Sequence, residues 1–172
     1  MSSHKASKRP DPQAQITISI RERLQEFDRD GTLAANLREA YELMRPHEEE
    51  IARAFWAAFD ESPYVQPKNT ADTLDSRIKA SIDYSREKFT NVTGQRWADM
   101  ALTNAAWAER AGVPLFATMA AFAAAYDVVV RIVFRGCDGD TDKLARLGRA
   151  LRQMGMMEAE IMAAFVSEYR AR

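Results

Sequence analysis

The strongest constraint on the fold is the spacing of apolar residues in the last third of the chain. Apolar side chains there recur in two series, at alternating steps of four and three residues, and Glu158 is the one polar residue at an interior step of the second. The series are Leu115, Met119, Phe122, Tyr126, Val129 and Val133, then Leu144, Leu147, Leu151, Met154, Ile161 and Phe165. This spacing is typical of long helices that pack side by side at a small angle. The short break at 136–139 predicts that the two helices form a hairpin.

The rest of the chain also has helical spacing, interrupted by few breakers. Only seven glycines and six prolines occur, and they separate the apolar series. We predict helices over about 20–27, 33–44, 46–61, 70–93 and 97–111, with Thr32 and Thr70 as N-caps, Pro46 in a first turn and Gly112 as a C-cap. A brief alternation at residues 16–20 is the only strand-like pattern, so the sequence predicts an all-α protein.

Composition favours one globular domain in a reducing compartment. The 172 residues are 47% hydrophobic, which suffices for a core, and the net charge of −1 argues against a nucleic-acid partner. We expect residues 1–14 to form a flexible polar leader and residues 15–172 to form the domain. A single cysteine allows no internal disulfide, and we recognise no secretory signal and no uninterrupted apolar run of about 20 residues. These features predict a cytoplasmic protein without a membrane partner.

Groups that could carry catalysis or bind a metal are scarce. The two histidines, His4 and His47, have no partner at the one-turn spacing of helical metal sites. His47 precedes three glutamates and is interpreted as part of a solvated helix start, with pH sensing or ligand binding as the alternative. Cys137 has no histidine beside it in the sequence, and no phosphate-binding glycine loop or nucleophile elbow occurs. We therefore expect neither an enzyme nor a metal site.

The order of the predicted helices and several short motifs resemble the globin-coupled sensor family of bacterial signal transducers. A leader helix precedes a proline-started helix that contains Phe55-Trp56 and ends at Ser62-Pro63. The segment from Ala108 to Pro114 is similar to the family's segment that runs from its iron-ligating histidine to a proline, and residues 156–161 are similar to its last-helix pattern. The resemblance covers roughly residues 16 to 172. It implies a globin-like fold with an extra N-terminal helix and a long C-terminal helical hairpin.

This chain departs from the family at the two positions that handle haem. The family's iron-ligating histidine aligns with Ala108, whose methyl group cannot coordinate iron. The tyrosine that donates a hydrogen bond to bound oxygen in many members aligns with Trp56. We therefore expect no haem and no other cofactor. The alternative is a haem-based oxygen or redox sensor with an atypical ligand, such as His47 or Met100.

The resemblance also implies a pocket in the place of haem. The residues expected to line it are Phe55, Trp56, Phe59, Met100, Asn104, Ala108, Phe116 and Met119. Two interpretations remain open at this point, because the aromatic and methionine side chains could fill the space, whereas Ala108 and the six alanines within residues 117–125 could leave room for an apolar small molecule.

Members of this family dimerise through their last two helices, which implies a homodimer here. The expected interface residues are Tyr126, Val130, Val133, Phe134, Leu147, Leu151, Met154, Met157, Ile161 and Phe165. The alternative is that these side chains pack within one chain. The family's last helix continues toward an output module, either a chemotaxis signalling rod or a diguanylate cyclase, which implies such a partner in cis or in trans.

Together these expectations describe a non-haem, globin-like sensory domain of a bacterial signal-transduction protein. A shift between two packings of the last two helices, biased by a ligand or a partner, would carry the signal. A ligand-free helical adaptor is the remaining alternative.

Overall fold

The computed structural model describes residues 18–65 and 73–171, and these residues form helices and connecting turns without a strand. The helices are α1 (Ile20–Phe27), α2 (Leu33–Met44), the 3-10 helix η2 (Arg45–His47), α3 (Glu48–Asp60), α4 (Leu74–Thr90), α5 (Arg96–Arg110), α6 (Leu115–Gly136) and α7 (Thr141–Ala171). The all-α prediction is confirmed. The predicted leader, residues 1–14, and the predicted cap Thr70 lie outside the described residues.

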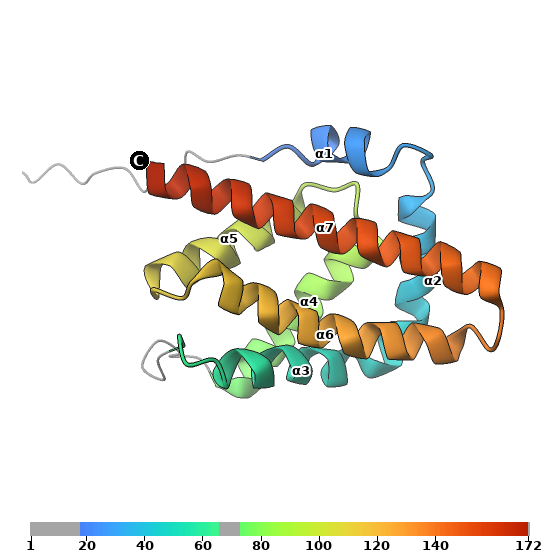
Figure 1. Ribbon diagram of the computed structural model, residues 1–172, viewed down its shortest axis with the longest axis horizontal. Coiled ribbons are helices and arrows are strands. Elements are labelled where there is room, and N and C mark those ends of the chain that lie inside the picture. Colours follow the sequence, from blue (N-terminus) through green and yellow to red (C-terminus); the bar gives the residue numbers. More distant parts are fainter. Residues whose placement is uncertain (1–17, 66–72, 172) are drawn as a thin grey trace, which may run out of the picture.

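The long helices α6 and α7 run antiparallel and side by side, joined by a short turn (Figure 1). Helix α3 packs most extensively against α6, on the side of α6 away from α7 in this view, while α4 and α5 lie behind the hairpin. Helix α2 crosses one end of the molecule and contacts α4, α6 and α7. The hairpin is thus covered by other helices on one face only, as far as the described residues extend.

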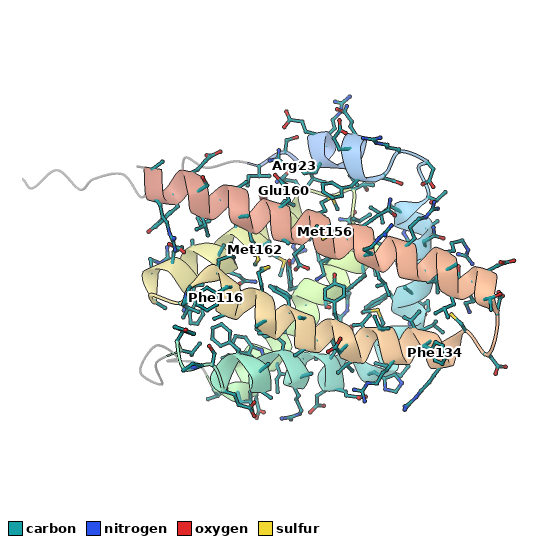
Figure 2. The ribbon with its side chains drawn as sticks, in the orientation of Figure 1. Arg23, Phe116, Phe134, Met156, Glu160 and Met162 are labelled. Carbon is teal, nitrogen blue, oxygen red and sulfur yellow. The ribbon has the colours of Figure 1, made fainter. Side chains whose placement is uncertain are left out.

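The short helix α1 is held on α7 by polar contacts from its middle and from its C-terminal end. The Arg23 guanidinium makes two hydrogen bonds to the Glu160 carboxylate, at 3.1 and 3.2 Å, and the two side chains face each other in Figure 2. The Gln153 side-chain amide donates to the Phe27 carbonyl at 2.6 Å. This extra N-terminal helix is therefore anchored to the hairpin.

Several helix ends differ from their predicted form. Thr32 makes no side-chain cap; instead an Asp28 carboxylate oxygen accepts the Leu33 N–H at 3.0 Å. Pro46 lies in η2, and α3 begins two residues later. Thr73 caps α4, since its hydroxyl oxygen accepts the Ser76 N–H at 3.2 Å. Gly112 does end α5, with a φ of +72° that glycine adopts without steric cost.

The main core lies where α2, α5 and α7 meet. Trp97 is fully buried, and its indole N–H donates to the Val92 carbonyl at 2.8 Å. Leu37 from α2 and Leu147 from α7 are also fully buried in this cluster. A smaller cluster joins α3, α5 and the start of α6 around Phe59 and Ala108. Between the two clusters the packing is incomplete.

Helix α6 is long and apolar enough, by length and composition alone, to cross a membrane, although no uninterrupted apolar run was recognised in the sequence. It carries Asp127 and Arg131, and one side of it packs against α3. The central helix of a water-soluble domain meets the same criterion, so this feature does not assign the chain to a membrane.

Candidate ligand cavity

A cavity of 410 Å³ lies between α3, α4, α5 and α6. Its volume falls within the range of small-molecule sites in proteins, about 300–1,000 Å³. Met162 from α7 closes its inner wall and is fully buried (Figure 2). The cavity is the incompletely packed region between the two hydrophobic clusters.

Aromatic rings form the apolar part of the cavity wall. The Phe55 ring centroid lies 5.0 Å from the Trp56 ring and 4.9 Å from the Phe122 ring, so α3 and α6 meet through these side chains. The Trp56 indole N–H donates to the Ser81 hydroxyl on α4 at 2.9 Å. Because that N–H is already bonded, Trp56 offers the cavity an apolar face.

The mouth of the cavity lies between α4 and α5. Its exposed lining residues all belong to these two helices, namely Ala80, Arg96, Asp99, Thr103 and Asn104. The Thr103 hydroxyl donates to the Asp99 carbonyl at 2.9 Å. The opening is therefore polar, whereas the wall behind it is mainly apolar.

A buried ion pair stands at the inner end of the cavity. The Lys88 ammonium on α4 lies 2.8 and 3.0 Å from the two carboxylate oxygens of Glu158 on α7, and the residues are 3% and 2% exposed. The Tyr84 hydroxyl donates to the same carboxylate. The ring centroids of Phe122 and Tyr126 each lie 5.6 Å from the Lys88 nitrogen. Removing two charges from water costs free energy, which an apolar pair of similar size would not incur.

The two tyrosines beside this ion pair are held as neutral phenols. Burial raises the pKa of Tyr84 well above its ordinary value, and the adjacent negative charge of Glu158 raises it further. Burial and then the charge of Glu158 raise the pKa of Tyr126 in the same way.

Two hydroxyl groups near the cavity are buried without a hydrogen-bond partner among the described residues, those of Thr118 and Tyr126. Thr118 is 7% exposed and lines the cavity wall from α6. A threonine inside a helix usually donates to the carbonyl one turn earlier, so an unpaired hydroxyl at this position is uncommon.

Six of the eight residues expected to line a pocket do line this cavity: Phe55, Trp56, Phe59, Met100, Asn104 and Ala108. The other two expectations were wrong. Phe116 is 59% exposed and packs edge-on against Tyr64, and Met119 packs against the main core. The cavity side of α6 is Thr118, Phe122, Ala125, Tyr126 and Val129. Phe116 and Met119 point elsewhere because each residue of a helix turns by about 100°.

The polar residues Lys88, Tyr84 and Thr118 were not predicted from the sequence. One signal was present. Glu158 occupies an interior step of an apolar series, and a buried carboxylate requires a partner. Nothing in the sequence identifies Lys88 as that partner, because α4 is polar on most of its surface.

Most residues expected at a dimer interface are buried inside the chain instead. This corrects the prediction for seven of them, which are at most 3% exposed: Val133, Leu147, Leu151, Met154, Met157, Ile161 and Phe165. Their apolar stripe packs against the core of their own chain. Tyr126 lines the cavity. Only Val130 and Phe134 remain available at the surface, with 55% and 63% exposure.

The cavity does not offer the iron ligand that the resemblance associates with this position. Ala108 contributes a methyl group to the wall, and no histidine or cysteine lines the cavity among the described residues. His47 lies outside it, half-exposed, with its ring nitrogen 3.3 Å from a Glu50 carboxylate oxygen. Met100 does line the wall. In the described part of the chain, no three histidine, cysteine or acidic side chains cluster as a metal site.

Comparison with protein-family models, with curated proteins and with solved structures found no significant match.

Proposed function

We propose that this chain is a non-catalytic, non-haem sensory domain of globin-like architecture from a cytoplasmic signalling protein. Its cavity binds a small molecule, and its α6–α7 hairpin pairs with a second copy. The observation that carries the proposal is the 410 Å³ cavity, because it joins the residues that the resemblance places around haem without providing the histidine.

The arrangement around the cavity supports the globin-like part of the proposal. Ala108 on α5 and Trp56 on α3, which align with the family's iron-ligand and oxygen-binding positions, line the same cavity from different helices. An extra N-terminal helix and a long C-terminal hairpin enclose the domain, in the order that the resemblance implies.

An exposed stripe along α6 supports pairing with a second copy. Its apolar members are Phe116, Ala120, Ala123, Val130 and Phe134, which follow steps of four and three on the side away from the core, with the exposed Asp127 at the step between Ala123 and Val130. Phe116 and Phe134 lie near the two ends of α6, and Met156, which is 60% exposed, lies on the neighbouring α7 (Figure 2). We call this surface the hairpin stripe. Large apolar side chains exposed together on one side of a helix hairpin favour an interaction surface.

Helix α7 contributes small residues to the same face. Gly148 precedes Met156 by about two turns, Ala159 and Ala163 follow it by one and two turns, and these small residues allow a partner helix to approach closely. Asp127 on α6 and Arg152 on α7 are both exposed and carry opposite charges. Two copies related by a two-fold axis would present each of these charges to the other copy.

The cavity and the hairpin stripe share one helix, which gives the proposed sensor its mechanism. Thr118, Phe122 and Tyr126 face the cavity from α6, while Val130 and Phe134 belong to its outer side. A ligand that binds better to one position of α6 shifts the population of dimer packings toward that position.

The dimer is tested by sedimentation equilibrium of the purified chain. We expect a dimer that dissociates in the Val130→Glu/Phe134→Glu double variant, because a buried carboxylate without a partner is strongly unfavourable. Leu74→Glu on α4 is the matched control, since Leu74 is 41% exposed and lies outside the hairpin stripe. A wild-type chain that stays monomeric at all concentrations contradicts this half of the proposal.

The cavity is tested with 2-ethylnaphthalene as an apolar probe. We expect it to raise the melting temperature of the wild-type protein, because a ligand that binds only the folded state stabilises it. Ala125→Leu adds side-chain volume to the cavity wall and should weaken this effect, whereas Ala35→Leu on the exposed face of α2 should not. An equal response of both variants would place the probe elsewhere.

The absence of haem chemistry is tested by absorbance of the purified protein after haem is added. We expect no band of protein-ligated haem. A ligated spectrum that is lost in Met100→Leu or in His47→Ala would favour the alternative of a haem sensor with an atypical ligand.

A further inference from the structure

The buried ammonium of Lys88 has more hydrogen-bond donors than the described residues accept. A lysine ammonium carries three N–H groups. In the described part of the chain, those of Lys88 meet only the two carboxylate oxygens of Glu158, at 2.8 and 3.0 Å. At least one N–H is therefore left without an oxygen or nitrogen acceptor. A buried charged donor in this state costs free energy, which a ligand oxygen would recover.

This ammonium lies at the inner end of the cavity. Lys88 is one of the lining residues, and four ring centroids lie between 4.9 and 5.6 Å from its nitrogen. The rings all belong to residues that also line the cavity: Tyr84, Phe89, Phe122 and Tyr126. Glu158 is not a lining residue. Lys88 is therefore the charged group that a molecule at the inner end would meet.

A second donor lies one turn earlier on α4. Ser85 also lines the cavity, is half-buried and makes no side-chain hydrogen bond with a described residue. Its hydroxyl is not sealed inside the protein, because the buried side-chain polar atoms without a partner are those of Arg77, Thr118 and Tyr126. The Ser85 hydroxyl is thus both unpaired and accessible.

Ser85 and Lys88 are three residues apart, so their side chains are neighbours on one side of α4. Both groups donate, and a carbonyl oxygen has two lone pairs with which to accept from both. The bond from the ammonium would be the stronger one, because its donor is charged. The pair therefore fits a single carbonyl oxygen better than an apolar group.

We propose that the cavity takes a mainly apolar molecule with a carbonyl oxygen, and that this oxygen accepts hydrogen bonds from the Lys88 ammonium and the Ser85 hydroxyl. This inference rests on the proposed function of the cavity and adds the class of ligand. The apolar body of the molecule packs against Phe55, Phe122 and Met162, which line the same cavity.

The test uses two probes with one ring system, 2-ethylnaphthalene and 2-acetylnaphthalene, which differ by the carbonyl group. Their dissociation constants for the full chain are measured by equilibrium dialysis. The ratio of the affinities for the acetyl and ethyl probes is then compared between the wild type and variants of the two donors. This comparison cancels the different hydration of the probes.

We expect the preference for the acetyl probe to fall about fivefold in Ser85→Ala, the size of one neutral hydrogen bond. In Lys88→Met/Glu158→Met, which removes the charged donor together with its counterion, it should fall about tenfold or more. Thr103→Val is the matched control and should leave the ratio unchanged. The Thr103 hydroxyl belongs to another lining residue but already donates to the Asp99 carbonyl.

The infrared band of the bound carbonyl group gives a second measurement, which a purely structural role of Ser85 would not change. Hydrogen bonds to a carbonyl oxygen lower its stretching frequency. With 2-acetylnaphthalene labelled with carbon-13 at the carbonyl group, we expect a higher frequency in Ser85→Ala than in the wild type, and no shift in Thr103→Val.

An unchanged affinity ratio in Ser85→Ala or in the double variant overturns this inference and leaves the proposed cavity function standing. If the double variant does not fold, the ratio and the carbonyl band of Ser85→Ala decide. If neither probe binds the wild-type chain, the cavity takes no apolar molecule, and the proposed function fails together with the inference.

Discussion

The interior of this chain has two unlike halves. In the packed half, α2, α5 and α7 meet through fully buried side chains such as Leu37, Trp97 and Leu147, and the buried indole N–H has its acceptor. In the cavity half, α3, α4, α5 and α6 enclose 410 Å³ of space, a buried ion pair and a hydroxyl without a partner. Both halves are built from the same kind of amphipathic helix.

The difference between the halves distinguishes the residues that stabilise the fold from the residues that form the proposed binding site. Close packing and paired polar groups stabilise a protein, and the packed half has both. The cavity half departs from these rules at several neighbouring positions. Departures of this kind are expected at functional sites, where stability is given up for binding.

The largest predicted effect is on the buried ion pair of the cavity half. Lys88→Met leaves the Glu158 carboxylate buried without its cation, so we expect the free energy of unfolding to fall by about 3–5 kcal/mol. The double variant Lys88→Met/Glu158→Met should recover most of this loss, because both charges are then gone. Urea unfolding of the wild type and the two variants measures both changes. A loss below about 1 kcal/mol in the single variant would show that water reaches the pair.

Replacing a methionine by alanine should lower the free energy of unfolding by different amounts in the two halves. Met154→Ala removes a fully buried side chain from the packed half, and we expect a loss of about 2–5 kcal/mol. Met100→Ala removes the same atoms from the half-buried cavity wall and should cost less than about half as much, since that side chain already borders open space. Urea unfolding gives both values. Equal losses would contradict the distinction between the halves.

The pH dependence of stability should reveal the buried tyrosines of the cavity half. The pKa of Tyr84 is raised in the folded state, so its contribution is fully present below the ordinary tyrosine pKa of 10.0 and is lost as the pH rises through the folded-state value. We expect the free energy of unfolding to fall above pH 10, with at most about 1.4 kcal/mol per pH unit from this group. Tyr84→Phe should flatten that slope. An unchanged slope would mean that Tyr84 ionises freely in the folded protein.

The smallest predicted effects are those of removing two threonine hydroxyls. The two changes in the free energy of unfolding should differ in sign. Thr118→Val removes an unpaired buried hydroxyl from the cavity half, and we expect stability to stay level or rise by up to about 1 kcal/mol. Thr90→Val removes a hydroxyl that donates to the Arg86 carbonyl at 2.7 Å and should lower stability by about 0.5–1 kcal/mol. Thermal unfolding monitored by circular dichroism measures the stability of both variants and of the wild type. A loss in Thr118→Val would indicate that its hydroxyl has a partner in the unliganded protein.

The packed half was largely predictable from the sequence, because its signal is periodic. The series that contains Leu147 and Leu151 identified both the helix and the residues that share one side of it. What periodicity did not reveal was which surface that side faces. The stripe expected at a dimer interface is the chain's own core, since a heptad-like pattern describes packing between helices within a chain as well as between chains.

The cavity half was predictable only in part. Phe55, Trp56 and Ala108 were found through the resemblance, which supplied their common place in the fold. Lys88 and Thr118 could not be found, because their role depends on contacts between α4, α6 and α7 that no local pattern records. A buried partner for Glu158 was implied by its position, but the identity of that partner is a property of the tertiary fold.

The central claim is that the cavity half binds a small molecule while the packed half supports it. Backbone amide chemical shifts of the isotope-labelled chain, recorded while 2-acetylnaphthalene is added, test this claim most directly. We expect shifts that concentrate on residues lining the cavity from α3, α4, α5 and α6, with little change around Leu37 in α2 and Leu147 in the first half of α7. Shifts centred on α1 and α2, or confined to the hairpin stripe, would contradict this claim.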